Sequence, residues 1–271
     1  IKAQLENEEL RELNAQLREL NEMKDKFISI TNHEIRTPLT IIKGYLEILE
    51  TSIDSSAQEL TEIIDIMKRT TLELTNTANR MHILSHARRN NWSSVYKQIE
   101  LTSLVKNIYR DMRRLFEHRA IDFQIDLPST ATYVNGVPLA LKMVIIELLH
   151  NALKFTPDRG EVTLSVSQHR KRVFIEVSDT GIGIPYEKQE LVFANFYEIQ
   201  DTVNHKSSRE EFMGGGMGIG LSLVKEILTN LNGKIVLISD PGNGTTFKVS
   251  LPNPVKFKEE SELADLHPYK C

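Results

Sequence analysis

One histidine has neighbours that suit nucleophilic chemistry. His33 is followed at once by an acid, Glu34, and Thr37 comes one helical turn later. A carboxylate that accepts the ring proton leaves the other ring nitrogen nucleophilic at neutral pH. The Thr37 hydroxyl, on the same face of a helix, can hold a water molecule against a group attached to His33. The three residues predict a site at which the imidazole of His33 accepts a group from a donor.

A second group of residues suits a bound nucleotide and its metal. Glu147 and Asn151 are four residues apart, so both project from one face of a helix. A carboxylate and an amide oxygen are suitable ligands for Mg²⁺, which binds substrate phosphates. Lys154, near the end of the same helix, can reach a phosphate. These residue types predict a magnesium and phosphate site.

A third group suits a purine base. Asp179 follows a predicted strand and begins the segment DTGIGIP. Its carboxylate can accept a hydrogen bond from an exocyclic amine, and Gly181 and Gly183 let the backbone come close to a flat base.

A fourth segment, GGGMGIGL, opens a helix near the C-terminal end of the chain. Backbone N–H groups of a glycine-rich helix N-terminus bind phosphate. Taken alone, such a segment is more often only a flexible turn. Its candidate ligand-binding positions are Gly216, Gly218, Gly220 and Leu221.

The helix that carries His33 must present it to solvent. Apolar residues follow it at alternating spacings of four and three, which is typical of a heptad seam. His33 lies two residues before this seam, so we expect it at the edge of the apolar face. The seam consists of Ile35, Leu39, Ile42, Leu46, Leu49 and Ile53.

A second amphipathic helix is predicted after the polar loop 52–56. Two such helices expose too much apolar surface to be stable alone, and two copies forming a four-helix bundle would bury it. The sequence therefore predicts a homodimer with both copies of His33 on the outside of the bundle. The weaker alternative is that a second domain of the same chain covers the apolar seam. The second seam consists of Leu60, Ile64, Met67, Thr71, Leu74, Ala78 and Met81.

The rest of the chain divides around this hairpin. Leucines at three-four-three spacing predict a short coiled coil over 1–26, against the alternative of a single solvated helix. The helical hairpin is expected over 27–91, a domain of mixed helices and strands over 96–252 and a loose tail over 253–271.

Residues after 96 change to a mixed pattern of helices and strands. Two predicted hairpins and three helices indicate a sheet with helices on one face. We expect strands at 98–101, 121–127, 162–166, 173–177, 234–239 and 245–251, and helices at 102–118, with Thr102 as the cap, 138–155 and 221–231. The fold class is therefore α+β, a coiled coil and helical hairpin followed by an α/β sandwich.

The segment FISITNHEIRTPL resembles the H-box of two-component sensor histidine kinases. In that family the histidine is autophosphorylated, which the resemblance assigns to His33. By the same resemblance Glu34 is the general base, and Glu34 with Thr37 supports dephosphorylation of the partner response regulator.

Four further segments resemble the N, G1, F and G2 boxes of these kinases, within the GHKL ATPase superfamily. They are 147–157, 179–185, 193–197 and 214–221. The resemblance implies that Asn151 binds Mg²⁺, that Asp179 reads the adenine amino group and that the glycines line the phosphates. With the neighbouring Lys154, Phe155 and Leu221, they form the expected ATP site.

The lid expected at 198–215 departs from the family. The F-box is often followed by a basic residue, and this chain has Glu198. Neutralisation of the phosphates would then come from Lys206 or Arg209.

The predicted function is ATP-dependent autophosphorylation of His33 followed by transfer to an aspartate of a receiver domain, with reverse phosphatase activity. Two alternatives remain open. A GHKL clamp ATPase would have no use for the H-box histidine. The intact Asn151, Asp179 and glycine segments argue against a non-catalytic signalling scaffold that binds nucleotide and dimerises.

The composition of the chain limits its expected partners and cellular compartment. The 271 residues carry a net charge of −4 without a strongly basic stretch, so nucleic acid is not expected as a partner. One cysteine, Cys271, suits a reducing compartment. No apolar run is long enough to span a bilayer, and the chain opens at Ile1 in a helical pattern. We expect a cytoplasmic fragment, attached to a membrane only through a missing upstream segment.

Overall fold

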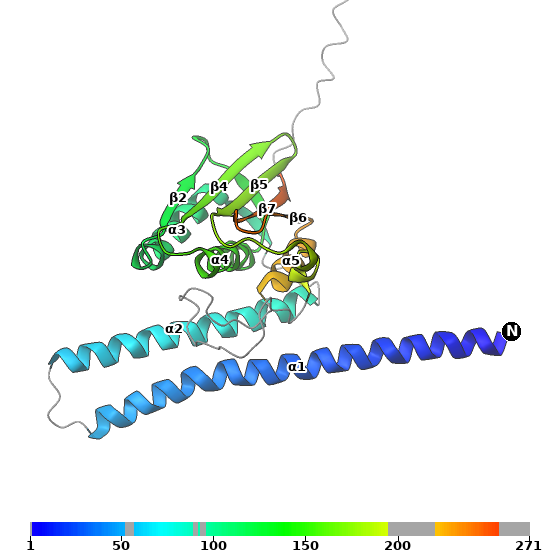
Figure 1. Ribbon diagram of the computed structural model, residues 1–271, viewed down its shortest axis with the longest axis horizontal. Coiled ribbons are helices and arrows are strands. Elements are labelled where there is room, and N and C mark those ends of the chain that lie inside the picture. The colour runs from blue at the N-terminus through cyan, green and yellow to red at the C-terminus, as the bar shows by residue number, and fades with distance from the viewer. Residues whose placement is uncertain (1, 52–56, 89–91, 93–95, 195–219, 255–271) are drawn as a thin grey trace, which may run out of the picture. The chain divides into compact units, whose positions relative to one another are not determined.

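The computed structural model describes residues 2–51, 57–88, 92, 96–194 and 220–254 (Figure 1). The chain forms two compact units, Ile1–Ile83 and Leu84–Cys271, and each is described by itself. Within the described ranges, no helix has the length and apolar character needed to cross a membrane.

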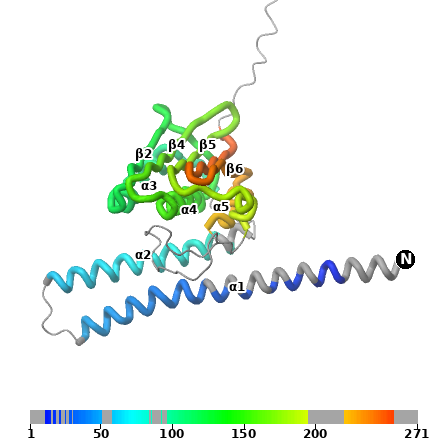
Figure 2. Tube along the Cα trace, in the orientation of Figure 1, coloured from blue at the N-terminus to red at the C-terminus, as the bar shows by residue number. Residues whose placement is uncertain are grey.

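The first unit is a hairpin of two long helices. Helix α1 spans Lys2–Thr51 and continues through Pro38, and α2 spans Ala57–Arg88. The two run antiparallel (Figure 2), and the Thr31 hydroxyl on α1 lies 3.4 Å from the Met81 sulfur on α2. The polar loop predicted at 52–56 lies outside the described residues.

The residues of each predicted seam alternate between half-buried and exposed positions. Alternate seam positions on α1, seven residues apart, are half-buried at Ile35, Ile42 and Leu49. The positions between them are exposed, with Leu39 at 49% and Leu46 at 46%. The second helix repeats the division, because Leu60, Met67, Leu74 and Met81 are half-buried and Ile64, Thr71 and Ala78 are exposed. Contacts within the hairpin thus cover only one of the two seam positions in each heptad.

The second unit is built on a five-stranded sheet in the order β2-β4-β5-β7-β6. Strand β2 is parallel to β4, and the other neighbours are antiparallel. A separate antiparallel pair joins β1 to β3. The strands are β1 Lys97–Glu100, β2 Asp122–Asp126, β3 Tyr133–Gly136, β4 Glu161–His169, β5 Arg172–Asp179, β6 Lys234–Ser239 and β7 Thr245–Pro252.

Three helices lie on one face of this sheet (Figure 1): α3 Leu101–His118, α4 Pro138–Phe155 and α5 Gly220–Asn230. Two short 3₁₀ turns, η1 Tyr186–Lys188 and η2 Leu191–Phe193, follow β5. Alternate residues of the central strands are buried, as a two-residue period requires, and they form the core with the helices. The strand residues of this core are Val162, Leu164, Val166, Val173, Ile175, Val177, Phe247, Val249 and Leu251.

The helix ends follow local sequence rules with one exception. Pro138 occupies the first turn of α4, where its missing N–H costs no hydrogen bond. Helix α5 ends in a left-handed Asn232, with φ of 53°, and the Gly233 N–H donates to the Leu228 carbonyl at 2.7 Å. The prediction that Thr102 caps α3 is wrong: Glu100 is the N-cap residue, and the Thr102 hydroxyl donates to its carboxylate.

Candidate active site

His33 lies on α1 with its side chain exposed, as expected from its position beside the seam. Thr37, one turn later, is also exposed, and its hydroxyl donates to the His33 carbonyl oxygen at 3.1 Å. Glu34 is half-buried. The imidazole is therefore accessible to a second domain, and the Thr37 oxygen keeps lone pairs that can accept a hydrogen bond from water.

Helix α4 carries the candidate metal ligands. Glu147 is buried, with 6% of its surface exposed, and Asn151 is half-buried. The Asn151 side-chain nitrogen is buried, and no hydrogen-bond partner for it lies within the described part of the chain. A buried amide of this kind is suited to a polar ligand, so the residues fit a site for a hydrated ion and phosphates. Lys154 extends over the Phe155 ring, with its ammonium nitrogen 5.0 Å from the ring centroid.

Asp179 ends β5 with its carboxylate buried. Its Oδ1 accepts hydrogen bonds from the Gly181 N–H at 2.9 Å and from the Thr245 N–H at 3.2 Å. Burial raises the pKa of Asp179 to about 6, although both backbone hydrogen bonds lower it. Because both bonds fall on Oδ1, the Oδ2 atom takes part in neither and is the oxygen suited to an external amine.

The loop after β5 is packed against the last turn of α4. The Ile182 N–H donates to the Phe155 carbonyl at 3.1 Å. A Cβ on Gly181 would lie 2.5 Å from the same carbonyl oxygen and 2.6 Å from Asp179 Oδ1. Only glycine fits this approach, so the Asp179 segment is held directly against the helix that carries Asn151.

The turn between β6 and β7 supports this loop from another side. The Gly242 N–H donates to the Ile182 carbonyl and the Ile184 N–H to the Ser239 hydroxyl, both at 2.9 Å. Gly244 has φ of +91°, and a Cβ there would lie 1.9 Å from the Asp179 carbonyl oxygen. Sequence reasoning missed this contribution, and its one local signal was the PGNG turn beside the last strand.

The glycine-rich segment is described only from its last glycine. A Cβ on Gly220, the first residue of α5, would lie 2.7 Å from Glu147 Oε2. The N-terminus of α5 therefore lies against the candidate metal ligand, and η2 packs on α5. Phe193 of the third segment makes an edge contact with Phe247, with centroids 6.3 Å apart.

Several predicted residues lie outside the described ranges. They belong to residues 195–219 and include Lys206, Arg209, Gly216 and Gly218. The described residues bring together α4, the loop after β5 and the start of α5, and leave Leu221 half-buried in the first turn of that helix.

Two glycines with similar backbones should differ sharply in their tolerance of alanine. Gly242 has φ of +84°, and no described atom lies within 4 Å of the position that a methyl group would take, so Gly242→Ala should cost about 1 kcal/mol of unfolding free energy. Gly244→Ala should cost about 3 kcal/mol or more, because its methyl group must displace the Asp179 carbonyl. Urea unfolding of both variants tests this. Equal losses of unfolding free energy would show that the Asp179 carbonyl moves aside at little cost.

Asp179→Asn should change how stability depends on pH. The folded pKa of Asp179 lies above its ordinary value of 3.8, so its stabilising contribution is complete below pH 3.8 and is lost as the pH rises through about 6. The amide has no such titration. The variant's stability relative to the natural protein should therefore be about 1 kcal/mol more favourable at pH 8 than at pH 5. Urea unfolding at both pH values measures this difference, and a pH-independent difference would contradict it.

Comparison with known proteins agrees with this arrangement. Residues 136–255 match the family model of histidine kinase-, DNA gyrase B-, and HSP90-like ATPases, and residues 23–90 match that of the His Kinase A (phospho-acceptor) domain. Together the two matches include α1 from before His33, α2 and the whole candidate nucleotide site.

Two curated relatives are similar over most of this chain. The adaptive-response sensory kinase SasA of Thermosynechococcus vestitus is 31% identical over 252 residues, which cover 90% of this chain and 64% of the relative. The phosphate regulon sensor protein PhoR of Pseudomonas aeruginosa is 28% identical over 229 residues, covering 84% and 50%. The chain thus spans between half and two thirds of the lengths of these relatives.

A solved structure shares the fold. The histidine kinase ThkA, in a crystal structure with the response regulator protein TrrA, aligns with a TM-score of 0.54 at 21% identity over 87% of this chain and 64% of the other. From the two family matches and these relatives, the chain belongs to the two-component histidine kinases, with a HisKA phospho-acceptor domain followed by a GHKL-type ATPase domain.

Proposed function

We propose that this chain is an ATP-dependent protein-histidine kinase that phosphorylates its own His33 and passes the phosphoryl group to an aspartate of a response regulator. The observation that carries the proposal is the exposed His33 on α1, with Glu34 beside it and Thr37 one turn later, in a chain that also builds the Asp179 site. The relative ThkA, which was crystallised with a response regulator, supports the second step.

The second unit would bind ATP through the segments gathered around α4. Asp179 Oδ2 would accept a hydrogen bond from the adenine amino group, because Oδ1 is already held by two backbone N–H groups. Gly181 and Gly183, whose missing side chains leave room for the Phe155 and Asp240 carbonyls, would hold the backbone of this loop beside the flat base. Lys154 would turn from the Phe155 ring toward a phosphate, and Gly216, Gly218 and Gly220 would line the phosphates.

Asn151 and Glu147 would hold a Mg²⁺ ion, which phosphoryl transfer from ATP requires. Bound Mg²⁺ neutralises charge on the β- and γ-phosphates and fixes their orientation. Two features of α4 support this assignment. The buried Asn151 nitrogen has no hydrogen-bond partner among the described residues, so it could donate to a phosphate oxygen while the amide oxygen faces the ion, and Glu147 faces the start of α5. Lys206 and Arg209 would add positive charge near the γ-phosphate, in place of the basic residue often found after the F-box.

The transfer step needs little from the protein beyond positioning and one proton acceptor. Glu34 would accept the proton from one ring nitrogen of His33, so that the other nitrogen attacks the γ-phosphorus and ADP leaves. In the reverse, phosphatase reaction, the Thr37 hydroxyl would orient a water molecule toward the aspartyl phosphate of the partner. Its hydrogen bond to the His33 carbonyl keeps this hydroxyl beside the histidine.

The first unit would form a homodimer. Exposed apolar side chains recur on both helices at the seam positions that the hairpin leaves uncovered. A second hairpin would bury them as a four-helix bundle. The functional boundaries would be a signalling helix over 1–26, a dimerisation and phosphotransfer hairpin over 27–91 and a catalytic domain over 96–252. The single cysteine is compatible with a cytoplasmic setting.

Labelling with γ-³²P ATP and Mg²⁺ tests the kinase reaction, with His33→Gln as the matched variant. The natural chain should acquire a label that is lost in acid and stable in base, as a phosphohistidine is, and the variant should acquire none, because it lacks the proposed acceptor imidazole. ATP hydrolysis without a labelled chain would favour a clamp ATPase. Nucleotide binding without turnover would favour a scaffold, and either result would overturn the proposal.

Sedimentation equilibrium tests the dimer. The natural chain should sediment at about twice its mass of 31.0 kDa. Leu39→Glu combined with Leu46→Glu should weaken association more than about tenfold, because each buries a charge in the predicted interface. Thr40→Glu, which adds a charge at an exposed position beside the seam, is the control and should leave the dimer intact. A natural chain that sediments as a monomer would exclude this interface.

A further inference from the structure

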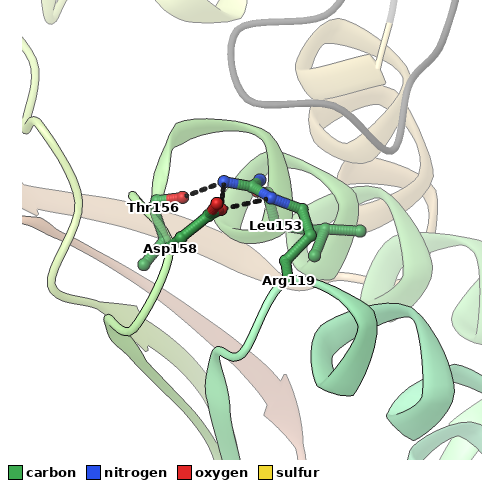
Figure 3. A network of polar contacts seen from close by, with 4 residues as sticks. All are labelled: Arg119, Leu153, Thr156 and Asp158. Carbon is green, nitrogen blue, oxygen red and sulfur yellow. Dashed lines mark hydrogen bonds and ion pairs between the residues drawn. The ribbon is translucent and has the colours of Figure 1, made fainter.

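Arg119 follows α3 and has a buried side chain, of which 9% is exposed. Figure 3 shows its guanidinium group between the end of α4 and Asp158. The Asp158 Oδ1 atom accepts two hydrogen bonds from it, at 2.9 Å from Nε and 2.6 Å from one terminal nitrogen. The Leu153 and Thr156 carbonyl oxygens accept further bonds from the terminal nitrogens, the second at 3.0 Å.

These carbonyl groups belong to the end of a helix, where the chain supplies no following turn. The last four carbonyls of an α-helix have no partner within the helix, so the guanidinium provides donors that α4 cannot provide itself. A cation at this end also interacts favourably with the helix dipole. Asp158, which is 70% exposed, fixes the guanidinium from the other side.

One of the two residues between the bonded carbonyls connects this cluster to the nucleotide site. Phe155 directly precedes Thr156, and its own carbonyl accepts the Ile182 N–H at 3.1 Å. Gly181 approaches that same oxygen so closely that no side chain fits. The position of the Phe155 carbonyl therefore sets the position of the loop that follows Asp179.

We propose that Arg119 is a positioning residue for nucleotide binding, which holds the last turn of α4 and, through the Phe155 carbonyl, the loop that carries Gly181 and Ile182. Its hydrogen bonds described above go to the Leu153 and Thr156 carbonyls and to the Asp158 carboxylate, none of which is a proposed ligand of ATP. The consequence for nucleotide affinity depends on the proposed ATP-binding function, whereas the consequence for the loop does not.

Two measurements on the full chain separate positioning from general stabilisation. The first is hydrogen exchange of the Ile182 amide by NMR, relative to amides of the central strand β5. The second is the Kd of a fluorescent ATP analogue with Mg²⁺, measured where urea unfolding shows the variant to be fully folded. Loss of a residue that only adds global stability would speed exchange of Ile182 and of β5 together, and would leave the Kd of the folded protein unchanged.

Arg119→Gln is the main variant, because glutamine is uncharged and too short to join Asp158 to both carbonyls. We expect Ile182 exchange at least about tenfold faster, with β5 unchanged, and analogue binding about tenfold weaker. Arg113→Gln removes an exposed arginine of α3 that pairs with Glu117, and as the control it should change neither value.

Arg119→Lys and Asp158→Asn cover the case in which the glutamine variant does not fold. Lysine keeps the charge but lacks the planar fork that serves several acceptors at once, so it should show the same changes at smaller size. Asp158→Asn leaves the carbonyl bonds in place and should shift Ile182 exchange by about two- to threefold.

Folded Arg119 variants with natural Ile182 exchange would overturn the proposal. Faster exchange with an unchanged Kd would refute the role in nucleotide binding. If the natural chain binds no analogue, the proposed ATP function fails, and the exchange experiment still decides whether Arg119 positions the loop.

Discussion

The close packing of the loop after β5 on the last turn of α4 is the constraint on which the second unit depends. A backbone carbonyl, that of Phe155, accepts the Ile182 N–H and leaves no space for a side chain at Gly181. Asp179 uses one carboxylate oxygen to hold the backbone of this loop and of β7. The loop is therefore held by one main-chain hydrogen bond and by two bonds from main-chain N–H groups to the Asp179 carboxylate.

In the first unit the candidate reactive residue is exposed rather than held by neighbouring backbone. Its reactive candidate, His33, stands on the surface of a long helix, and the seam beside it is only partly covered. An exposed histidine on a regular helix can be approached by different partners in turn, which a buried one could not. The candidate nucleotide site and the accessible histidine thus belong to different units, so the proposed phosphorylation of His33 would use groups supplied by both.

Local sequence rules predicted most of the helices and strands. The bounds of α4 were predicted at 138–155 because Pro138 marks its start and an apolar pattern continues to Phe155. The hairpins β4–β5 and β6–β7 were predicted from alternation and turn residues. Strand β3 was missed, because its four residues pair with β1, more than thirty positions earlier, and have no local signal. The same limit applied to the candidate site. Asp179 was predicted from its own segment, but its bond from Thr245 and the bonds of Arg119 join distant segments of the chain.

The contact between η2 and α5 has a consequence for how this chain can vary. It brings together the two ends of a segment of 25 residues, 195–219, which connects Ala194 to Gly220. The entropy of closing such a connection grows only with the logarithm of its length, so a doubling costs about 0.6 kcal/mol. A change in the number of residues between Ala194 and Gly220 should therefore cost the sheet and its helices little while η2 keeps its contact with α5.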